Sequence, residues 1–500
     1  MKSTQHIENP DVILIGSGIM SATLGAVLKE LDPSLKIQLY ELTEALALEA
    51  SNGWHNAGTG HAGLCEPSYT PDYGPDGEVV VDKAIEICHQ FQHSLQFWGH
   101  AVRSGMIDAP HEFVQSVPHL SFVYGQEQVD FLRSRHRQMS RHHFFKAMEY
   151  TEDREKIREW APLILEGRAE DEPVAMTRMR HGTDVNFGTL SAKLIEWLGN
   201  QDGCGFASSH RVTDLKKVDG RWQLKIKDLK ANRVFSNSAQ FVFIGAGGGT
   251  LPLLQKANIP EAKGIGGFPI GGQWLISEKP ELIEQHHAKV YGMSPGAAPT
   301  MAVPHLDTRI IDGKKALLFG PYAAWTTKFL HKKGSLLDLP KSISLDNIAS
   351  LIKVGLHNIP LVTYLIQQGT QSMKTRMGEL QNFFPAADVK DWHLIDAGIR
   401  VQAIKKEDGD AGIVHFGTEV ITDAARSLSA LLGASPGASV STNIILEIVQ
   451  KCFAETLATP EGHARMQRII PSYDEDLCKA EMDARQTSLQ TAAMEALKLI

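Results

Sequence analysis

One stretch near the N-terminus constrains the fold more than any other part of the chain. The apolar run at 12–15 is followed by Gly16-Ser17-Gly18, and good helix formers cover 19–31. A second apolar-rich run, at 36–41, ends in Glu41. This order predicts a βαβ unit whose glycine turn lies at the N-terminus of its helix. Such a turn lets a pyrophosphate approach backbone N–H groups, and an acidic residue after the second strand suits a ribose hydroxyl, so we expect a dinucleotide site.

The charge balance limits the classes of partner. Fifty Lys and Arg residues stand against 58 Asp and Glu residues in a chain of 500, a net charge of −8. A net-negative chain without a recognisable RNA or DNA module is not expected to bind nucleic acid. An anionic substrate would need a local cluster of Arg, Lys or His.

The cysteines and the apolar runs indicate in which cellular compartment the protein is expected. Five cysteines, with no CxxC pair among them, indicate free thiols in a reducing compartment, and no spacing typical of a metal site is present. The first apolar run is too short for a signal peptide, and no stretch reaches the roughly 18 uncharged apolar residues that span a membrane. We expect a cytoplasmic protein, and the sequence carries no signal for its oligomeric state.

A polar, glycine-dense loop at 51–63 distinguishes two kinds of dinucleotide site. It follows shortly after the second predicted strand and reads SNGWHNAGTGHAG. An NAD domain normally continues into another helix at this point, whereas small residues let the backbone run along an extended cofactor toward its reactive ring. The loop therefore favours FAD over NAD, a choice that Glu41 alone leaves open.

Glu41 together with the segment SNGWHNAGTGHAGLCE at 51–66 resembles the malate:quinone oxidoreductase family. These enzymes are flavoproteins of the wider D-amino-acid-oxidase and 2-hydroxyglutarate-dehydrogenase superfamily. The resemblance runs from about residue 11 to about residue 450. Further matching motifs lie at 117–125, 182–188, 303–309, 319–322, 397–402 and 433–439.

The expected fold is α/β, with a Rossmann-like FAD-binding domain built from discontinuous segments. A second, substrate-binding domain is expected to contain a mixed or antiparallel sheet. A strand at 241–244 that runs into glycines, a hairpin over 211–227 turned at Asp219-Gly220, and a helix at 442–453 support this reading. The expected boundaries are 8–90, 182–255 and 386–450 for the FAD-binding domain, 91–181 and 256–385 for the substrate-binding domain, and 451–500 for a C-terminal helical segment.

The resemblance implies that FAD lies along the first glycine turn, the 52–61 loop and two later glycine-rich segments. The segment at 433–439 precedes a helix, whose N-terminal N–H groups would stabilise negative charge on a reduced flavin. The residues expected at the cofactor are Gly16, Gly18, Ile19, Met20, Glu41, Asn52, Asn56, Gly58, Thr59, Gly60, Gly245, Ala246, Gly247, Gly433, Ser435, Pro436, Gly437, Ala438 and Ser439.

The reaction implied is oxidation of (S)-malate to oxaloacetate by hydride transfer to the flavin, with electrons passed to a membrane quinone. It also implies a protein peripheral on the inner face of the cytoplasmic membrane. A base for the malate hydroxyl must be neutral near pH 7, which favours histidine, and His61 and His305 are the two candidates. A dianionic substrate favours bidentate arginines, so Arg400 is the first candidate and Arg309 the second. Tyr322 is a candidate hydrogen-bond donor to the substrate.

Two segments leave a membrane contact open. The aliphatic run at 348–366 suits an interfacial helix, although a helix packed on the protein's own core is favoured. The basic run at 133–146 suits anionic lipid, although a solvated helix face is the plainer interpretation.

Three other functions fit the same features less well. A flavin-dependent lactate or 2-hydroxyglutarate dehydrogenase or oxidase would share the fold and the mechanism. A non-catalytic binding protein would not need the dinucleotide site that Gly16, Gly18 and Glu41 predict. An NAD-linked malate dehydrogenase does not account for the loop at 51–63.

Overall fold

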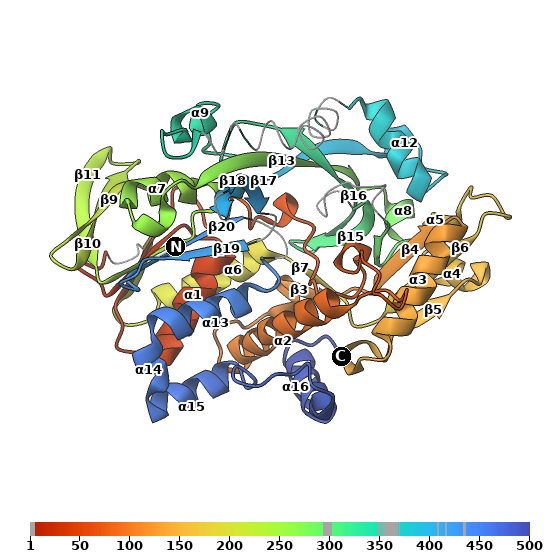
Figure 1. Cartoon of the computed structure of the whole chain (residues 1–500), viewed down its shortest axis with the longest axis horizontal. Coiled ribbons are helices and arrows are strands. Elements are labelled where there is room, and N and C mark those ends of the chain that lie inside the picture. Colours follow the sequence, from red (N-terminus) through yellow and green to blue (C-terminus); the bar gives the residue numbers. More distant parts are fainter. Residues whose placement is uncertain are drawn as a thin grey trace.

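Two large β-sheets organise the chain (Figure 1). The computed structural model describes residues 6–293, 303–348, 371–407, 410–415, 418–433 and 437–500, together with the single positions 351, 353 and 369. The first sheet has six strands, in the spatial order β19 (Thr418–Thr422), β20 (Leu428–Gly433), β12 (Phe241–Ile244), β1 (Val12–Ile15), β2 (Ile37–Tyr40) and β8 (Cys204–Ala207).

The predicted βαβ unit is confirmed at the centre of this sheet. Strand β1 pairs in parallel with β2 and with β12, and helix α1 (Ile19–Leu31) connects β1 to β2. Val12 and Leu14 pack into one hydrophobic cluster, while Ile13 and Ile15 pack into another on the opposite face. The strand is an unbroken apolar run because it is buried on both faces.

Helices cover one face of the six-stranded sheet, and a small sheet covers the other. The apolar cluster on the helical side is shared by α1, α2 (Asp82–Arg103), α6 (Phe187–Gly199), α13 (Ser441–Cys452), α15 (Pro460–Ile469) and α16 (Asp483–Ala496). The other face packs against α7 (Thr250–Ala257) and the antiparallel strands β9 (His210–Val218), β10 (Arg221–Asp228) and β11 (Arg233–Ala239). Asp219 and Gly220 both have positive φ, 49° and 80°, as a type I′ hairpin turn requires, so the predicted hairpin is confirmed.

The second large sheet is mixed, as expected. Only the pairing of β14 with β4 is parallel among the pairings described for this sheet. Helices α4 (Arg154–Trp160), α5 (Pro162–Leu165) and α12 (Met373–Phe383) share its apolar cluster. The spatial order is β18 (Asp410–His415), β17 (His393–Glu407), β13 (Gly266–Ser277), β16 (Lys314–Trp325), β15 (His305–Ile311), β14 (Lys289–Tyr291), β4 (His119–Tyr124), β6 (Val174–Met179) and β5 (Glu149–Thr151).

The predicted domain boundaries stay a prediction. Strand β17 belongs to the nine-stranded sheet, although its residues fall in the 386–450 segment that was assigned to the FAD-binding domain. The 451–500 segment is helical over α14 (Ala454–Ala458), α15 and α16. Within the described residues, no helix combines the length and the apolar character needed to cross a membrane.

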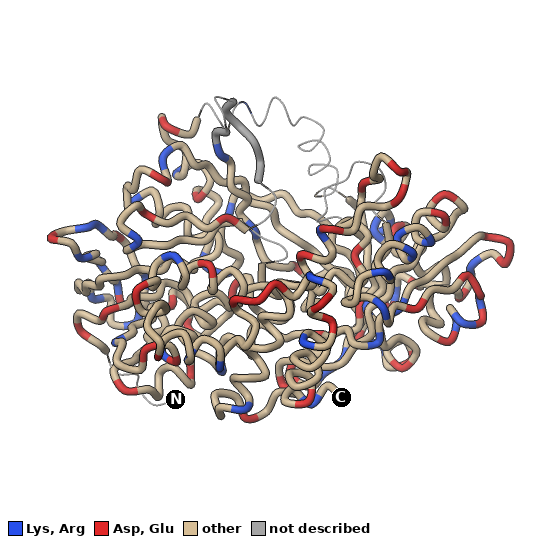
Figure 2. Tube along the Cα trace, turned by 60° about the horizontal axis from the view of Figure 1, so that its bottom comes forward, with Lys and Arg blue, Asp and Glu red and all other residues tan. Residues whose placement is uncertain are grey.

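Of the two segments considered for a membrane contact, the one at 348–366 lies almost wholly outside the described residues. The basic run at 133–146 is largely paired within the protein. Arg133 forms ion pairs with Asp130 and Glu152, and Lys146 forms one with Asp483. The Arg135 side chain is fully buried, and its Nε donates a hydrogen bond to the Thr70 hydroxyl. Figure 2 shows acidic and basic positions interspersed along the chain, which agrees with a solvated helix face for α3 (Gln126–Met139).

Candidate active site

Three adjoining cavities run from the first glycine turn toward the nine-stranded sheet. The first, of about 540 Å³, is lined by the turn at 16–18 and by Glu41. The second, of about 190 Å³, shares with the first the residues Ala50, Ser51, Gly245, Gly247, Gly248 and Ile399. The third, of about 530 Å³, shares with the second the residues Ala57, His61, Thr418 and Arg400. Shared walls make the three cavities one elongated path, a shape that suits an extended dinucleotide.

The glycine turn leaves room and donors for a phosphate. Gly16 has φ +93°, and a Cβ there would lie 2.6 Å from the Gly245 carbonyl oxygen, so only glycine fits this close approach of two strand ends. Gly18 is the N-cap of α1 and supplies no side-chain cap, and the first turn of the helix has no acidic residue. Ser51 accepts a hydrogen bond from the Ile19 N–H at 3.0 Å. The N-terminus of α1 has no side-chain cap from Gly18 itself and no acidic residue in its first turn, which suits the anion site that a pyrophosphate needs.

Glu41 lines the first cavity, and its carboxylate is already hydrogen-bonded. One oxygen accepts from the Ser17 N–H and hydroxyl at 2.7 and 2.5 Å, and the other accepts from the Thr43 N–H and hydroxyl at 2.7 and 2.6 Å. Four donors hold the carboxylate at the end of β2, facing the turn at 16–18. A ribose hydroxyl would contact it by taking the place of a serine or threonine hydroxyl.

Most of the residues expected at the cofactor line the first two cavities. Those that do so are Gly16, Gly18, Glu41 and Ala246 in the first, Ile19, Met20, Asn56, Gly58, Thr59, Gly433, Gly437, Ala438 and Ser439 in the second, and Gly245 and Gly247 in both. Asn52 and Gly60 are not lining residues. The Asn52 carboxamide accepts from the Trp54 N–H, and a Cβ on Gly60 would point into Thr183. Ser435 and Pro436 lie outside the described residues.

Sequence reasoning missed several further lining residues, among them Ser51 and Ile399. Ser51 opens the glycine-dense loop and so had a local signal, whereas Gly248 falls in the glycine-rich segment after β12 that was expected to lie along the cofactor. Ile399 precedes Arg400 on β17 and lines the first two cavities. Its place follows from the pairing of β17 with β13, for which the sequence has no local signal.

His61 and His305 line the third cavity together. His61 Nδ1 lies 3.4 Å from a Glu66 carboxylate oxygen. Burial, followed by the nearby charges of His119 and His305, lowers the pKa of His61 to about 3, so its imidazole is neutral at pH 7. Burial also raises the pKa of the Glu66 carboxyl.

His305 has a different environment, since it is held between a carboxylate and an aromatic ring. Its Nδ1 lies 2.9 Å from Asp307 Oδ2, and its ring stacks on Tyr291 at 4.3 Å between centroids. The Tyr291 hydroxyl lies 2.8 Å from the Thr59 hydroxyl, which ties this pair to the loop. Burial alone would raise the pKa of Asp307, but the charges of His305 and Lys289 outweigh it and hold the pKa at about 2. A carboxylate at Nδ1 leaves the other ring nitrogen of His305 for a ligand.

Arg400 lines both the second and the third cavity. It lies on β17, where its register partner on β13 is Ile270, and Gln402, two residues along the strand, lines the third cavity on the same face. Burial lowers the pKa of its guanidinium. Within the described residues, no hydrogen bond or ion pair of Arg400 is found. Glu66 lines the same cavity and acts on the guanidinium electrostatically without an ion pair, so the hydrogen-bond donors of this half-buried group are suited to bind a carboxylate ligand.

Arg309 and Tyr322, the other two residues expected at the substrate, lie outside the three cavities. The Arg309 guanidinium is fully buried, forms an ion pair with Asp184 and donates to the Gly53 carbonyl at 2.6 Å. The Tyr322 hydroxyl donates to the Arg376 carbonyl at 2.9 Å within the apolar cluster of the second sheet. Neither side chain lines any of the three cavities.

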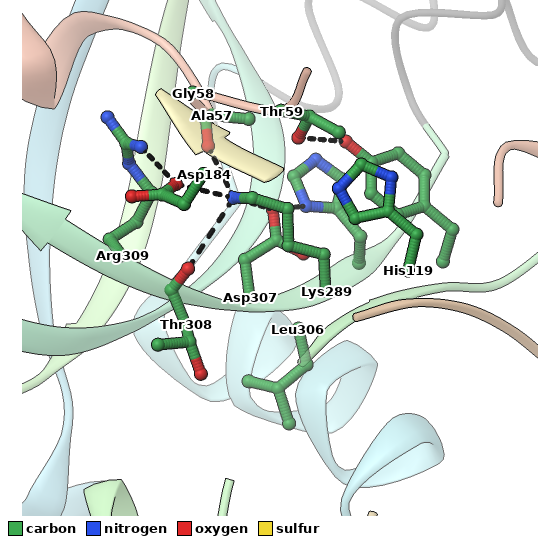
Figure 3. A network of polar contacts seen from close by, with 12 residues as sticks. Ala57, Gly58, Thr59, His119, Asp184, Lys289, Leu306, Asp307, Thr308 and Arg309 are labelled. Carbon is green, nitrogen blue, oxygen red and sulfur yellow. Dashed lines mark hydrogen bonds and ion pairs between the residues drawn. The ribbon is translucent and has the colours of Figure 1, made fainter. Parts of the chain in front are cut away.

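A buried network of charges lies under the loop at 53–59 (Figure 3). Lys289 Nζ lies at its centre, 2.9 Å from Asp184 and 3.3 Å from Asp307, and it donates to the Ala57 carbonyl at 2.8 Å. Arg309 is the second cation, so Lys289 and Arg309 balance the two carboxylates. Each of these four residues is at most 1% exposed. Gly58 fits above this network only as glycine, since a Cβ there would lie 1.6 Å from Arg309 Nη1. The network holds the carbonyls of the loop that lines the second cavity.

Solved structures with a similar fold include an FAD-bound oxidase. The structure superposes on L-α-glycerophosphate oxidase from Mycoplasma pneumoniae, solved with FAD bound, with a TM-score of 0.56 and 15% identity over 89% of this chain and 95% of that one. It superposes on glycine oxidase from Geobacillus kaustophilus with a TM-score of 0.54 and 14% identity, over 89% of this chain and 95% of that one. At such identities the likeness concerns the fold alone.

Sequence relatives are much closer. A probable malate:quinone oxidoreductase of Geobacillus kaustophilus is 50% identical over 98% of this chain and 97% of its own length. A probable malate:quinone oxidoreductase 2 of Pseudomonas aeruginosa is 47% identical over 100% of this chain and 97% of its own length. The family model for malate:quinone oxidoreductase (Mqo) matches residues 8–499. The match therefore continues past residue 450, where the recognised motifs end. The chain belongs to the malate:quinone oxidoreductase family.

Proposed function

We propose that this protein is an FAD-dependent enzyme that oxidises (S)-malate to oxaloacetate and passes the electrons to a membrane quinone. The observation that carries the proposal is the place of Arg400. This arginine makes no hydrogen bond or ion pair within the described residues and lines both the second cavity, with His61, and the third cavity, with His61 and His305. A carboxylate bound there would bring its substrate between the cofactor path and two histidines. The names of the close relatives supply malate and quinone.

The protein's own residues would hold the cofactor along the first two cavities. The N-terminus of α1 would bind the pyrophosphate, Glu41 would bind the adenosine ribose, and the loop at 56–59 together with 437–439 would enclose the flavin. When bound, FAD supplies the acceptor for the hydride that leaves malate C2. Arg400 holds one malate carboxylate so that C2 and its hydroxyl lie in the third cavity. Arg309 serves the loop and not the substrate, and Tyr322 packs in the core.

His305 is the better placed of the two candidate bases. Asp307 Oδ2 lies 2.9 Å from Nδ1 and would stabilise the positive charge that the ring gains when it takes the proton of the malate hydroxyl. His61 has no comparably short contact, since its Nδ1 lies 3.4 Å from Glu66, and burial beside His119 and His305 lowers its pKa to about 3. His61 then contributes to substrate orientation.

Rapid anaerobic reduction of the flavin separates the two histidines. We expect His305→Asn to slow flavin reduction by malate about 10²-fold or more, and His61→Asn to slow it less, because a general base contributes about 10²–10⁴-fold. Asp307→Asn should slow reduction while keeping the substrate affinity. The converse order of the two histidine variants would assign the base to His61. A loss below about threefold in both would assign the proton transfer to water.

The activity is tested by flavin bleaching on purified, FAD-reconstituted protein without oxygen. (S)-Malate, (R)-malate, lactate and 2-hydroxyglutarate are added separately, and the reduced protein is then mixed with a soluble quinone or with NAD⁺. We expect fast bleaching by (S)-malate and reoxidation by the quinone. Bleaching by lactate or 2-hydroxyglutarate alone would move the specificity to another 2-hydroxy acid, and no bleaching would contradict the proposed activity.

The proposed quinone acceptor implies where in the cell the enzyme is located. A respiratory quinone resides in the bilayer, so the enzyme must meet the membrane surface to be reoxidised. We place the protein peripherally on the inner face of the cytoplasmic membrane, where malate is available.

A further inference from the structure

We propose a zinc site between helix α2 and the C-terminal segment, made by His89, Asp476 and Cys478. One ligand atom of each residue lies within 4.8 Å of the others. His89 lies in the second turn of α2, and the other two residues lie in the connection between α15 and α16. The site is separate from the three cavities, because none of its residues lines them.

The donor set indicates the class of metal. Imidazole, thiolate and carboxylate are the three ligand types of zinc sites in proteins, whereas Mg²⁺ and Ca²⁺ prefer oxygen ligands alone. Three protein ligands leave a fourth position for water in a tetrahedral site. A ligand-atom spacing of up to 4.8 Å is slightly wider than a closed zinc site needs, and small side-chain rotations would bring the atoms together.

One further observation supports a ligand at this place. The Nδ1 atom of His89 is buried and has no hydrogen-bond partner within the described residues. A buried ring nitrogen without a partner is costly unless a ligand satisfies it.

The connection around Cys478 is positioned by hydrogen bonds of its backbone, one of which uses a carboxylate oxygen of Asp476. His142 and His143 contact the carbonyls of Cys478 and Leu477 at 2.9 and 3.0 Å, and the Cys478 N–H donates to Asp476 Oδ1 at 3.1 Å. The backbone is therefore held next to α2 before any metal binds. Bound zinc would link α2 directly to the C-terminal segment. This link would join residues that are almost four hundred positions apart in the sequence.

The test is zinc binding to the flavin-loaded, full-length protein. One equivalent of Zn²⁺ is expected to bind in isothermal titration calorimetry, and X-ray absorption at the zinc edge should show one sulfur at about 2.3 Å with N/O ligands at about 2.0–2.2 Å. Cys478→Ser and His89→Gln should each weaken the binding about 100-fold or more, beyond the 10–100-fold typical of outer-shell changes. Cys452→Ser, another half-buried free thiol, is the matched control and should bind zinc like the parent.

Three results would overturn the site. They are the absence of stoichiometric binding, an absorption spectrum without a sulfur neighbour, and equal affinity in Cys478→Ser and the parent. The Asp476→Asn variant serves as a second ligand variant that is not expected to misfold, because Asp476 is exposed and its replacement does not disturb the core. Flavin content and malate oxidation of each variant are measured in parallel, so that a folding defect is separated from loss of a metal ligand.

Discussion

Replacing Arg400 with alanine is expected to raise the KM for malate about 10²-fold while changing kcat little. Truncating one partner of a hydrogen-bonded charge pair costs about 2–5 kcal/mol, and each 1.4 kcal/mol is a factor of ten in affinity. The guanidinium holds a carboxylate that does not react, so it binds the ground state and the transition state about equally, and such a loss appears in KM. Steady-state kinetics with a soluble quinone measure both constants.

Two variants sharpen this test. Arg400→Lys keeps the charge but loses the bidentate geometry, and it should lie between the parent and the alanine variant. Arg137→Ala removes an exposed arginine that pairs with Glu78, and it should leave the kinetics unchanged. Unchanged KM in Arg400→Ala, with normal flavin content, would remove Arg400 from the substrate site. A fall in flavin content with unchanged KM would assign Arg400 to the cofactor instead.

Replacing Lys289 with methionine is expected to lower the free energy of unfolding by about 3–5 kcal/mol, because it leaves buried carboxylates without their cation. Lys289 contacts Asp184, Asp307 and the Ala57 carbonyl, and its side chain is fully buried. Loss of the bond to Ala57 should also loosen the loop at 53–59 and lower the flavin retained on purification. Urea unfolding followed by tryptophan fluorescence gives the midpoint and slope.

The control for this variant is Lys314→Met, which removes an exposed lysine from β16 in the same sheet and should shift the midpoint little. The double variant with Lys289→Met and Asp307→Asn removes one charge of each sign. It should be more stable than Lys289→Met alone if charge imbalance is the cause. Equal midpoints for Lys289→Met and Lys314→Met would show that the network does not stabilise the fold.

Local patterns in the sequence were sufficient for the dinucleotide fold. Helix α1 has the predicted bounds, 19–31, because its start is defined by Gly18 and its end by Asp32-Pro33. The hairpin of β9 and β10 was predictable because Asp-Gly favours a type I′ turn. Most of the residues that line the first two cavities near the glycine turn were predictable too, since small residues follow the ends of parallel strands, where ligands of open α/β sheets bind.

The partners of the charged residues in the second sheet were not predictable. His305, Asp307 and Arg309 alternate along β15 and share one face, which the period of a strand implies. Which of these side chains lines the third cavity depends on the charged partners that neighbouring elements place beside them. Asp184, on β7 (Thr183–Val185), pairs with Arg309 and removes it from the set of available cations, whereas Arg400 has no such neighbour among the described residues. These pairings join segments more than a hundred residues apart, and no local signal encodes them.

The order of the strands has a consequence for the synthesis of the protein. The proposed cofactor site forms where β1 pairs with β12, which follows β1 in the sequence by more than two hundred residues. Strand β12 in turn pairs with β20. A ribosome adds about 5–20 residues per second, so the glycine turn emerges many seconds before its partners. Pairings of such long sequence separation also form slowly. A nascent chain therefore has no complete cofactor site until residues up to 439 have been synthesised.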